Sequence, residues 1–180
     1  MSRGREVGPL SLPKEYRDLA KLRVETRWPD YQQPEDFGYD FRDWVSPYTK
    51  TACRLGSVAV VLQDWASADG LRGGPDADIQ QYGRTPRLRT NRMLDSLLRR
   101  VFGLSLPEVY ATNAFPFVKR GAMSNPVPLV DVVKAVQLSA ATELAIARPT
   151  VVVAAGAAAH SALSRVGIAG VRVPQLEVVA

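Results

Sequence analysis

The chain has 180 residues, of which 46% are hydrophobic, so it is long enough for one domain with a sizeable core. No apolar run approaches the roughly 20 residues of a membrane span, and the N-terminal segment lacks the apolar stretch of a secretory signal, so a cytoplasmic protein without a membrane partner is expected. The single cysteine, Cys53, excludes an internal disulfide framework and a cysteine-rich zinc site.

Apolar runs that alternate with helical patterns predict a parallel sheet with helices between its strands. The predicted strands are residues 58–62, 109–112, 149–155 and a fourth within 171–180. The predicted helices are residues 13–24, 41–44, 48–55, 92–102, 129–147 and 157–166, and residues 65–86 are predicted to form an irregular loop. We therefore expect a single α/β domain over residues 1–180, with three layers (α/β/α) and a central, mainly parallel four-stranded sheet.

Polar residues close two of the predicted strands. Gln63 and Asp64 follow the first apolar run, and Asn113 follows the second. In open α/β sheets, ligands bind at the carboxyl ends of the strands. A carboxylate and an amide at this edge offer a charge for an electron-poor centre and a donor–acceptor pair for a base edge.

These residues carry a family resemblance. The run Leu62-Gln63-Asp64-Trp65 resembles the first motif of the uracil-DNA glycosylase superfamily, whose best-known form is Gly-Gln-Asp-Pro-Tyr-His. In the same order along the chain, residues 84–91 resemble that family's phosphate-contacting loop, and Thr112-Asn113-Ala-Phe-Pro-Phe resembles the strand whose asparagine reads uracil. Residues 151–159 resemble the strand and small-residue turn that come next.

The chain also departs from the family's pattern. Leu62 replaces the usual glycine, and Trp65-Ala66 replaces a Pro-Tyr pair whose tyrosine excludes thymine in the best-known form. The family's second motif is a His-Pro-Ser-type loop that supplies a histidine to the base and an apolar wedge to the DNA. The sequence ends at Ala180, about where that loop would begin, so the loop is either naturally absent or truncated.

The resemblance implies a monofunctional DNA glycosylase that hydrolyses the N-glycosidic bond of uracil, or of another deaminated base, and leaves an abasic site. Asp64 would stabilise the oxocarbenium-like sugar and orient water, Gln63 would offer its backbone N–H, and Asn113 would pair with N3–H and O4. The base would be flipped out of single- or double-stranded DNA. Tyr82 is the first candidate for the aromatic residue that stacks on the base, and Phe115 and Trp65 are the next candidates. The implied enzyme is a monomer that needs no metal or organic cofactor.

Basic residues flank this predicted site. The net charge of +5 favours an anionic partner, and a basic cluster within residues 84–92 together with a basic pair at 119–120 would contact DNA phosphates. The alternative is that these arginines form a solvated helix face. Met123 and Phe117 are candidates for a wedge into the duplex. The predicted phosphate-contacting residues are Arg84, Arg87, Arg89, Lys119 and Arg120.

Other interpretations stay open. Asp64 and Asn113 can be turn residues, and Tyr82 can be a half-buried loop aromatic. His160, the one histidine, is more typical of a surface or interface position than of a general base. A non-catalytic binder of uracil-containing or abasic DNA is the main alternative function, and a nucleotide-binding α/β enzyme unrelated to DNA is a third.

Overall fold

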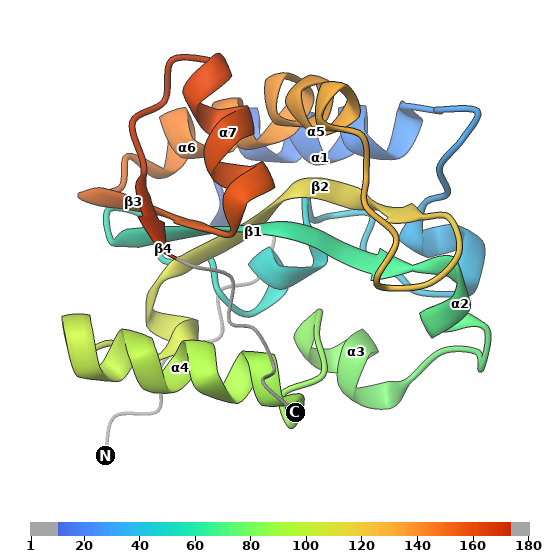
Figure 1. The fold of residues 1–180 in the computed structure, drawn as a ribbon, viewed down its shortest axis with the longest axis horizontal. Helices are drawn as coiled ribbons and strands as arrows, with labels where there is room; N and C mark the ends of the chain where they lie inside the picture. The colour runs from blue at the N-terminus through green and yellow to red at the C-terminus, as the bar shows by residue number, and fades with distance from the viewer. Residues whose placement is uncertain (1–10, 174–180) are drawn as a thin grey trace.

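Four parallel strands form the centre of the molecule. The computed structural model describes residues 11–173, and its strands lie in the order β2-β1-β3-β4 (Figure 1). The prediction of an α/β fold with a four-stranded parallel sheet is therefore confirmed. The strands are β1 (Val58–Ser67), β2 (Tyr110–Lys119), β3 (Val151–Ala155) and β4 (Val171–Val173).

Helices cover both faces of this sheet (Figure 1). The layer drawn above the sheet holds α1 (Lys14–Glu25), α5 (Leu129–Ala135), the π-helical turn η5 (Val136–Ala140), α6 (Ala141–Ala147) and α7 (Ala157–Arg165). The layer below it holds α3 (Ala77–Tyr82) and α4 (Arg89–Phe102). The predicted helix 129–147 is thus one apolar element interrupted by a π turn. Apolar side chains of β1 and β2 are fully buried between the layers because both faces of a parallel sheet need cover.

The two central strands are longer than the sequence pattern predicts. We expected them to end at residues 62 and 112, but β1 and β2 pair as far as Ser67 and Lys119. The register gains one residue in β2 between Phe115 and Val118, where Pro116 lies. A proline is tolerated there because β2 is an edge strand and the ladder is already irregular. Gln63, Asp64 and Asn113 therefore lie within strands, not beyond them.

The chain before β1 covers the open edge of β2. Short antiparallel bridges join Gln32 to Val118 and Cys53 to Tyr110, which satisfies edge groups that would otherwise be exposed. The predicted helices 41–44 and 48–55 do not form. Instead, prolines begin two 3₁₀ turns, η2 (Pro34–Phe37) and η3 (Pro47–Lys50), since proline is pre-set for a first helical position and the edge contacts keep the rest extended.

The predicted loop 65–86 contains regular structure. After β1 it forms α2 (Ala68–Leu71) and α3, and the side chain of Asp76 caps α3 by accepting the N–H of Ile79 at 2.9 Å. Gly83 ends α3 with φ 71°, and a Cβ there would lie 1.7 Å from the carbonyl oxygen of Pro47. Only glycine therefore allows α3 to pack against η3.

Helix α4 begins at Arg89, three residues before the predicted start. Asn91 does not cap it. Its side chain accepts the hydroxyl of Tyr48 and donates to the carbonyl of Thr85, which holds the preceding loop against the core. A short 3₁₀ turn, η4 (Leu106–Glu108), then leads into β2.

The predicted C-terminal departure from the family, at residues 174–180, lies outside the described residues. Within residues 11–173, no helix combines the length and apolar character needed to cross a bilayer.

Candidate functional site

Asn113 is a buried polar residue whose side chain is only partly hydrogen-bonded within the fold. Its side chain is fully buried on β2, and its Oδ1 accepts the hydroxyl of Ser46 at 2.7 Å. Its Nδ2 has no hydrogen-bond partner. A buried donor without an acceptor costs about 1–3 kcal/mol, so the arrangement indicates a missing partner that would accept a hydrogen bond, such as a carbonyl oxygen.

Asp64 lies diagonally across from Asn113. In the register of the two strands, Leu62 is opposite Asn113, and Asp64 is two residues further along β1. Residues paired across two neighbouring strands point to the same face of the sheet, and successive residues along one strand point to opposite faces. Asp64 and Asn113 therefore project from the same face. Strand rise and spacing place their Cα atoms about 8 Å apart. A nucleoside that contacted both residues would have its base at Asn113 and its sugar at Asp64.

A buried ion pair fixes the Asp64 carboxylate. Nζ of Lys119 lies 3.1 Å from its Oδ2, and the side chains of Lys119 and Asp64 are only 5% and 9% exposed. The same ammonium donates to the carbonyl of Met123, in the loop after β2. The sequence predicts Lys119 as a phosphate-contacting surface residue, but the structure turns it inward, because a carboxylate this far from water needs a counter-charge.

The turn after β3 adds backbone donors beside Gln63. The register of β1 with β3 ends where Leu62 faces Ala155, and α7 begins two residues later. Gly156 makes this tight turn with φ 103°, a conformation that glycine adopts without strain. No side chain caps the N-terminus of α7. Its N–H groups therefore present partial positive charge near Gln63, as is typical of anion-binding helix ends.

The three candidate stacking aromatics have different environments. Trp65 is 8% exposed, donates its indole N–H to the carbonyl of Gly83 at 2.9 Å and contacts Phe41 edge-on. Phe115 is fully buried against Trp28 and its neighbours. Both rings belong to the core. Tyr82, the first choice from the sequence, is half-buried at the end of α3 and keeps part of its side chain accessible.

The predicted phosphate-contacting arginines lie in two regions. Arg87 and Arg89 are exposed at the start of α4, whereas Arg84 is 9% exposed, donates to Thr51 and to the carbonyl of Tyr82, and lies over the ring of Tyr48. Burial lowers the pKa of the Arg84 guanidinium. Arg120 is exposed and pairs with Asp30 at 2.8 Å. Of the two wedge candidates, Met123 is 53% exposed and Phe117 is 2% exposed, so only Met123 is at the surface.

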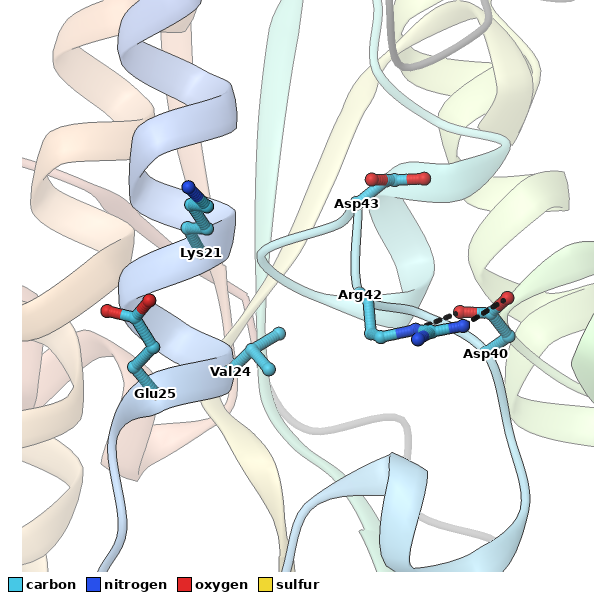
Figure 2. Close-up of a pocket in the computed structure, with 6 residues that line it drawn as sticks. All are labelled: Lys21, Val24, Glu25, Asp40, Arg42 and Asp43. Atoms are coloured by element: carbon cyan, nitrogen blue, oxygen red, sulfur yellow. Dashed lines mark hydrogen bonds and ion pairs between the residues drawn. The ribbon is translucent and has the colours of Figure 1, made fainter.

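Two cavities among the described residues lie away from Asp64 and Asn113. One, of about 470 Å³, opens between α1 and the turn after Tyr39, with Lys21, Val24 and Glu25 on one side and Asp40, Arg42 and Asp43 on the other (Figure 2). Its charges are of both signs, and Arg42 already pairs with Asp40 at 3.0 Å. This cavity is larger, but it shares no residue with the site described above and offers no unpaired buried group.

A smaller cavity of about 240 Å³ lies beside the start of α4. Its lining includes the buried Arg84 and Asn91, the exposed Arg92 and the acidic Asp95. The two guanidinium groups make it the more positive of the two cavities.

Two features of the site escaped sequence analysis. Ser46 lies in an irregular segment, 67 residues before Asn113, and no spacing links the two. In the sequence, Lys119 stands out only as one of a basic pair. Among residues 11–173, no three His, Cys, Asp or Glu side chains gather as metal ligands, and His160 lies half-buried on α7. No family model matches the chain, and a search of curated proteins gave no match.

Proposed function

We propose that this protein is a DNA N-glycosylase that releases uracil or a related deaminated base from single- or double-stranded DNA. The observation that carries the proposal is the buried Asn113 side chain, whose amide Nδ2 lacks an acceptor, on the strand beside Asp64. A uracil ring supplies the missing partner, because its O4 carbonyl accepts from Nδ2. The Asn113 Oδ1 has a second lone pair for N3–H beside the one that accepts from Ser46.

The chemistry follows from the position of Asp64. As the glycosidic bond stretches, positive charge grows at C1′ and negative charge on the departing base. The Asp64 carboxylate stabilises the first and orients the attacking water. The Gln63 backbone and the uncapped N-terminus of α7 stabilise the second.

The base reaches Asn113 only after the site opens, since this side chain has no exposed surface. A flipped nucleotide must displace the groups that cover it. The loop after β2 is largely exposed at residues 123–126, and it is tied to the site by the bond from Lys119 to Met123. Arg87, Arg89 and the cavity beside α4 would hold the flanking phosphates.

The test is base release from a labelled oligonucleotide that contains one deoxyuridine, in single- and double-stranded form. Asp64→Asn should lower the excision rate by about 100-fold or more, as removal of one charge-stabilising group does, while the melting temperature stays near that of the native protein. Asp69→Asn, which changes an exposed carboxylate paired with Arg72, is the matched control and should remain active. Full activity of Asp64→Asn would refute the assignment of Asp64.

A second candidate is a protein that binds uracil-containing or abasic DNA without cutting it. The ion pair with Lys119 favours this possibility, because a neutralised carboxylate stabilises a sugar cation less well. Binding in a gel-shift assay with no base release from any substrate would support it over the enzyme.

A further inference from the structure

The proposed excision chemistry makes no use of Lys119, yet this residue carries a primary amine in the middle of the site. Its side chain is 5% exposed, and its two partners are the Asp64 carboxylate at 3.1 Å and the carbonyl of Met123. An amine within hydrogen-bond distance of a carboxylate is a nucleophile with its own base. Lysine in such a protected site is suited to form a Schiff base with a carbonyl compound.

The order of the side chains along the sheet places this amine near the sugar. Asn113 faces Leu62, Asp64 follows two residues later, and Lys119 faces Ser67 but reaches back to Asp64. If the base lies on Asn113, the sugar extends toward Asp64. An amine 3.1 Å from the carboxylate that serves C1′ is then within reach of C1′ itself.

We propose that Lys119 forms a covalent imine with the abasic sugar that excision leaves behind. This inference rests on the proposed function, because the abasic sugar that would react with Lys119 is the product of the proposed excision reaction. The open form of an abasic deoxyribose carries an aldehyde at C1′. It is an electrophile that the intact nucleoside does not offer, so the covalent step is confined to the product.

The step balances without a further reactant. The Lys119 ammonium gives one proton to Asp64, and the free amine forms a bond to C1′ while the carbonyl electron pair moves to oxygen. Asp64 returns the proton to that oxygen, and the oxygen leaves as water with a second proton from nitrogen. The product is a protonated C1′=N imine, because the third proton stays on nitrogen, and water hydrolyses it in the reverse direction. The imine would shield the reactive aldehyde from solvent until the DNA is released.

Entry of the sugar requires one local change. The bond between Lys119 and the Met123 carbonyl must break, which frees the amine from the loop after β2. That loop is also held by the N–H of Asp69, which donates to the carbonyl of Gly121 at 3.1 Å. Residues 123–126 of that loop are exposed, so few buried contacts oppose the movement.

The experiment uses the full chain and an oligonucleotide that already contains one abasic aldehyde, with sodium cyanoborohydride to reduce any imine to a stable amine. The native protein should give a protein–DNA adduct on a denaturing gel. Lys119→Arg should lose the adduct, because guanidinium preserves the ion pair but forms no imine. Lys134→Arg, which changes an exposed lysine on α5, should retain it. A tetrahydrofuran analogue, which has no aldehyde, should give no adduct with any variant.

Peptide mapping of the native adduct makes the result independent of whether Lys119→Arg folds. A modified Lys119 supports the proposal. Modification of another amine, equal trapping of both variants, or no trapping of the native protein would each overturn it. Because the abasic site is supplied ready-made, trapping without release of uracil would refute the proposed glycosylase activity alone. Release of uracil without trapping would refute the imine alone.

Discussion

At the scale of single residues, four buried polar side chains define the site. Ser46 fixes the oxygen of Asn113, Lys119 fixes the carboxylate of Asp64, and Nδ2 of Asn113 is left without a partner. Buried polar groups in folded proteins are nearly always paired. Among the described residues, the buried side-chain atoms without a partner are Nε of Arg23 and Nδ2 of Asn113. The other two guanidinium nitrogens of Arg23 bind groups of the fold, whereas Nδ2 of Asn113 lies on the strand beside Asp64, where we propose that a ligand binds. The two supporting contacts keep Asn113 and Asp64 in one orientation.

Ser46→Ala tests this support. Loss of the hydroxyl leaves Oδ1 of Asn113 unpaired, which should lower the free energy of unfolding by about 1–3 kcal/mol, and it lets the amide rotate so that Nδ2 no longer faces O4. We expect KM for a deoxyuridine oligonucleotide to rise, measured by steady-state excision kinetics. The control is Ser57→Ala, which removes a hydroxyl just before β1 that donates to the backbone carbonyl of Glu108. Its KM should be unchanged. An unchanged KM for Ser46→Ala would contradict the orienting role.

At the scale of elements, one arginine connects α1 to the segment that covers β2. The side chain of Arg23 is fully buried and donates to Gln33, to Glu35 and to the backbone carbonyls of Phe41 and Trp44. These bonds hold the irregular chain between residues 33 and 44 in place. The same segment leads directly to Ser46, so the stability of this connection also positions the site.

Arg23→Met should therefore be strongly destabilising. It leaves the Glu35 carboxylate and two carbonyls without their donor, and breaking a buried pair in this way costs about 3–5 kcal/mol. Urea denaturation gives the free energy of unfolding. The control is Arg42→Met, which removes an exposed pair with Asp40 and should cost less than about 1 kcal/mol. Equal losses of unfolding free energy in the two variants would show that the buried network around Arg23 contributes no more stability than the exposed ion pair.

A second connection joins α6 to β2 through a buried carboxyl. Glu143 is fully buried and accepts the hydroxyls of Tyr110 and Thr112 at 2.8 and 2.6 Å. Burial raises its pKa to about 7, against the lowering effect of these two bonds. The folded protein thus keeps a proton on Glu143 that the unfolded chain, with an ordinary carboxyl pKa, releases near pH 4.5.

The proton on Glu143 should make the stability of the fold depend on pH. Between the unfolded and folded pKa values the native state binds more protons, so stability falls as pH rises. Relative to Glu143→Gln, the native protein should lose on the order of 3 kcal/mol between about pH 4.5 and 7, with little change at lower pH. Urea denaturation of both proteins across this range measures the difference. A difference that does not vary with pH would mean that Glu143 stays ionised in the fold.

At the scale of the whole molecule, exposed basic residues lie in both helical layers. Arg87 and Arg89 are exposed at the start of α4 in one layer, and Arg165 ends α7 in the opposite layer (Figure 1). If DNA lies against the α4 side, only charges there release counterions on binding. The affinity for DNA should then depend on salt in a way that identifies the contacting residues.

Arg87→Ala should weaken binding uniformly across sequences and reduce the slope of log K against log salt by about 1. Arg165→Ala, at the end of α7, should leave the slope unchanged. Fluorescence anisotropy with an abasic-analogue duplex at several salt concentrations gives both slopes. Identical slopes for the two variants and the native protein would place the DNA elsewhere.

The sequence by itself determined the alternation of strands and helices, because apolar periodicity is a local property. It also predicts that Gln63, Asp64 and Asn113 lie at the carboxyl ends of two neighbouring strands, whereas the structure places them within β1 and β2. The four-stranded parallel sheet confirms the first of these predictions. The function implied by the family resemblance stays a prediction.

Only the tertiary structure decided the rest. The lengths of β1 and β2, the inward turn of Lys119 and the burial of Trp65 depend on contacts between distant segments. The partner of Asp64 is 55 residues away along the chain, and that of Asn113 is 67 residues away. No local pattern encodes such pairs, because register and burial are set when the whole sheet packs.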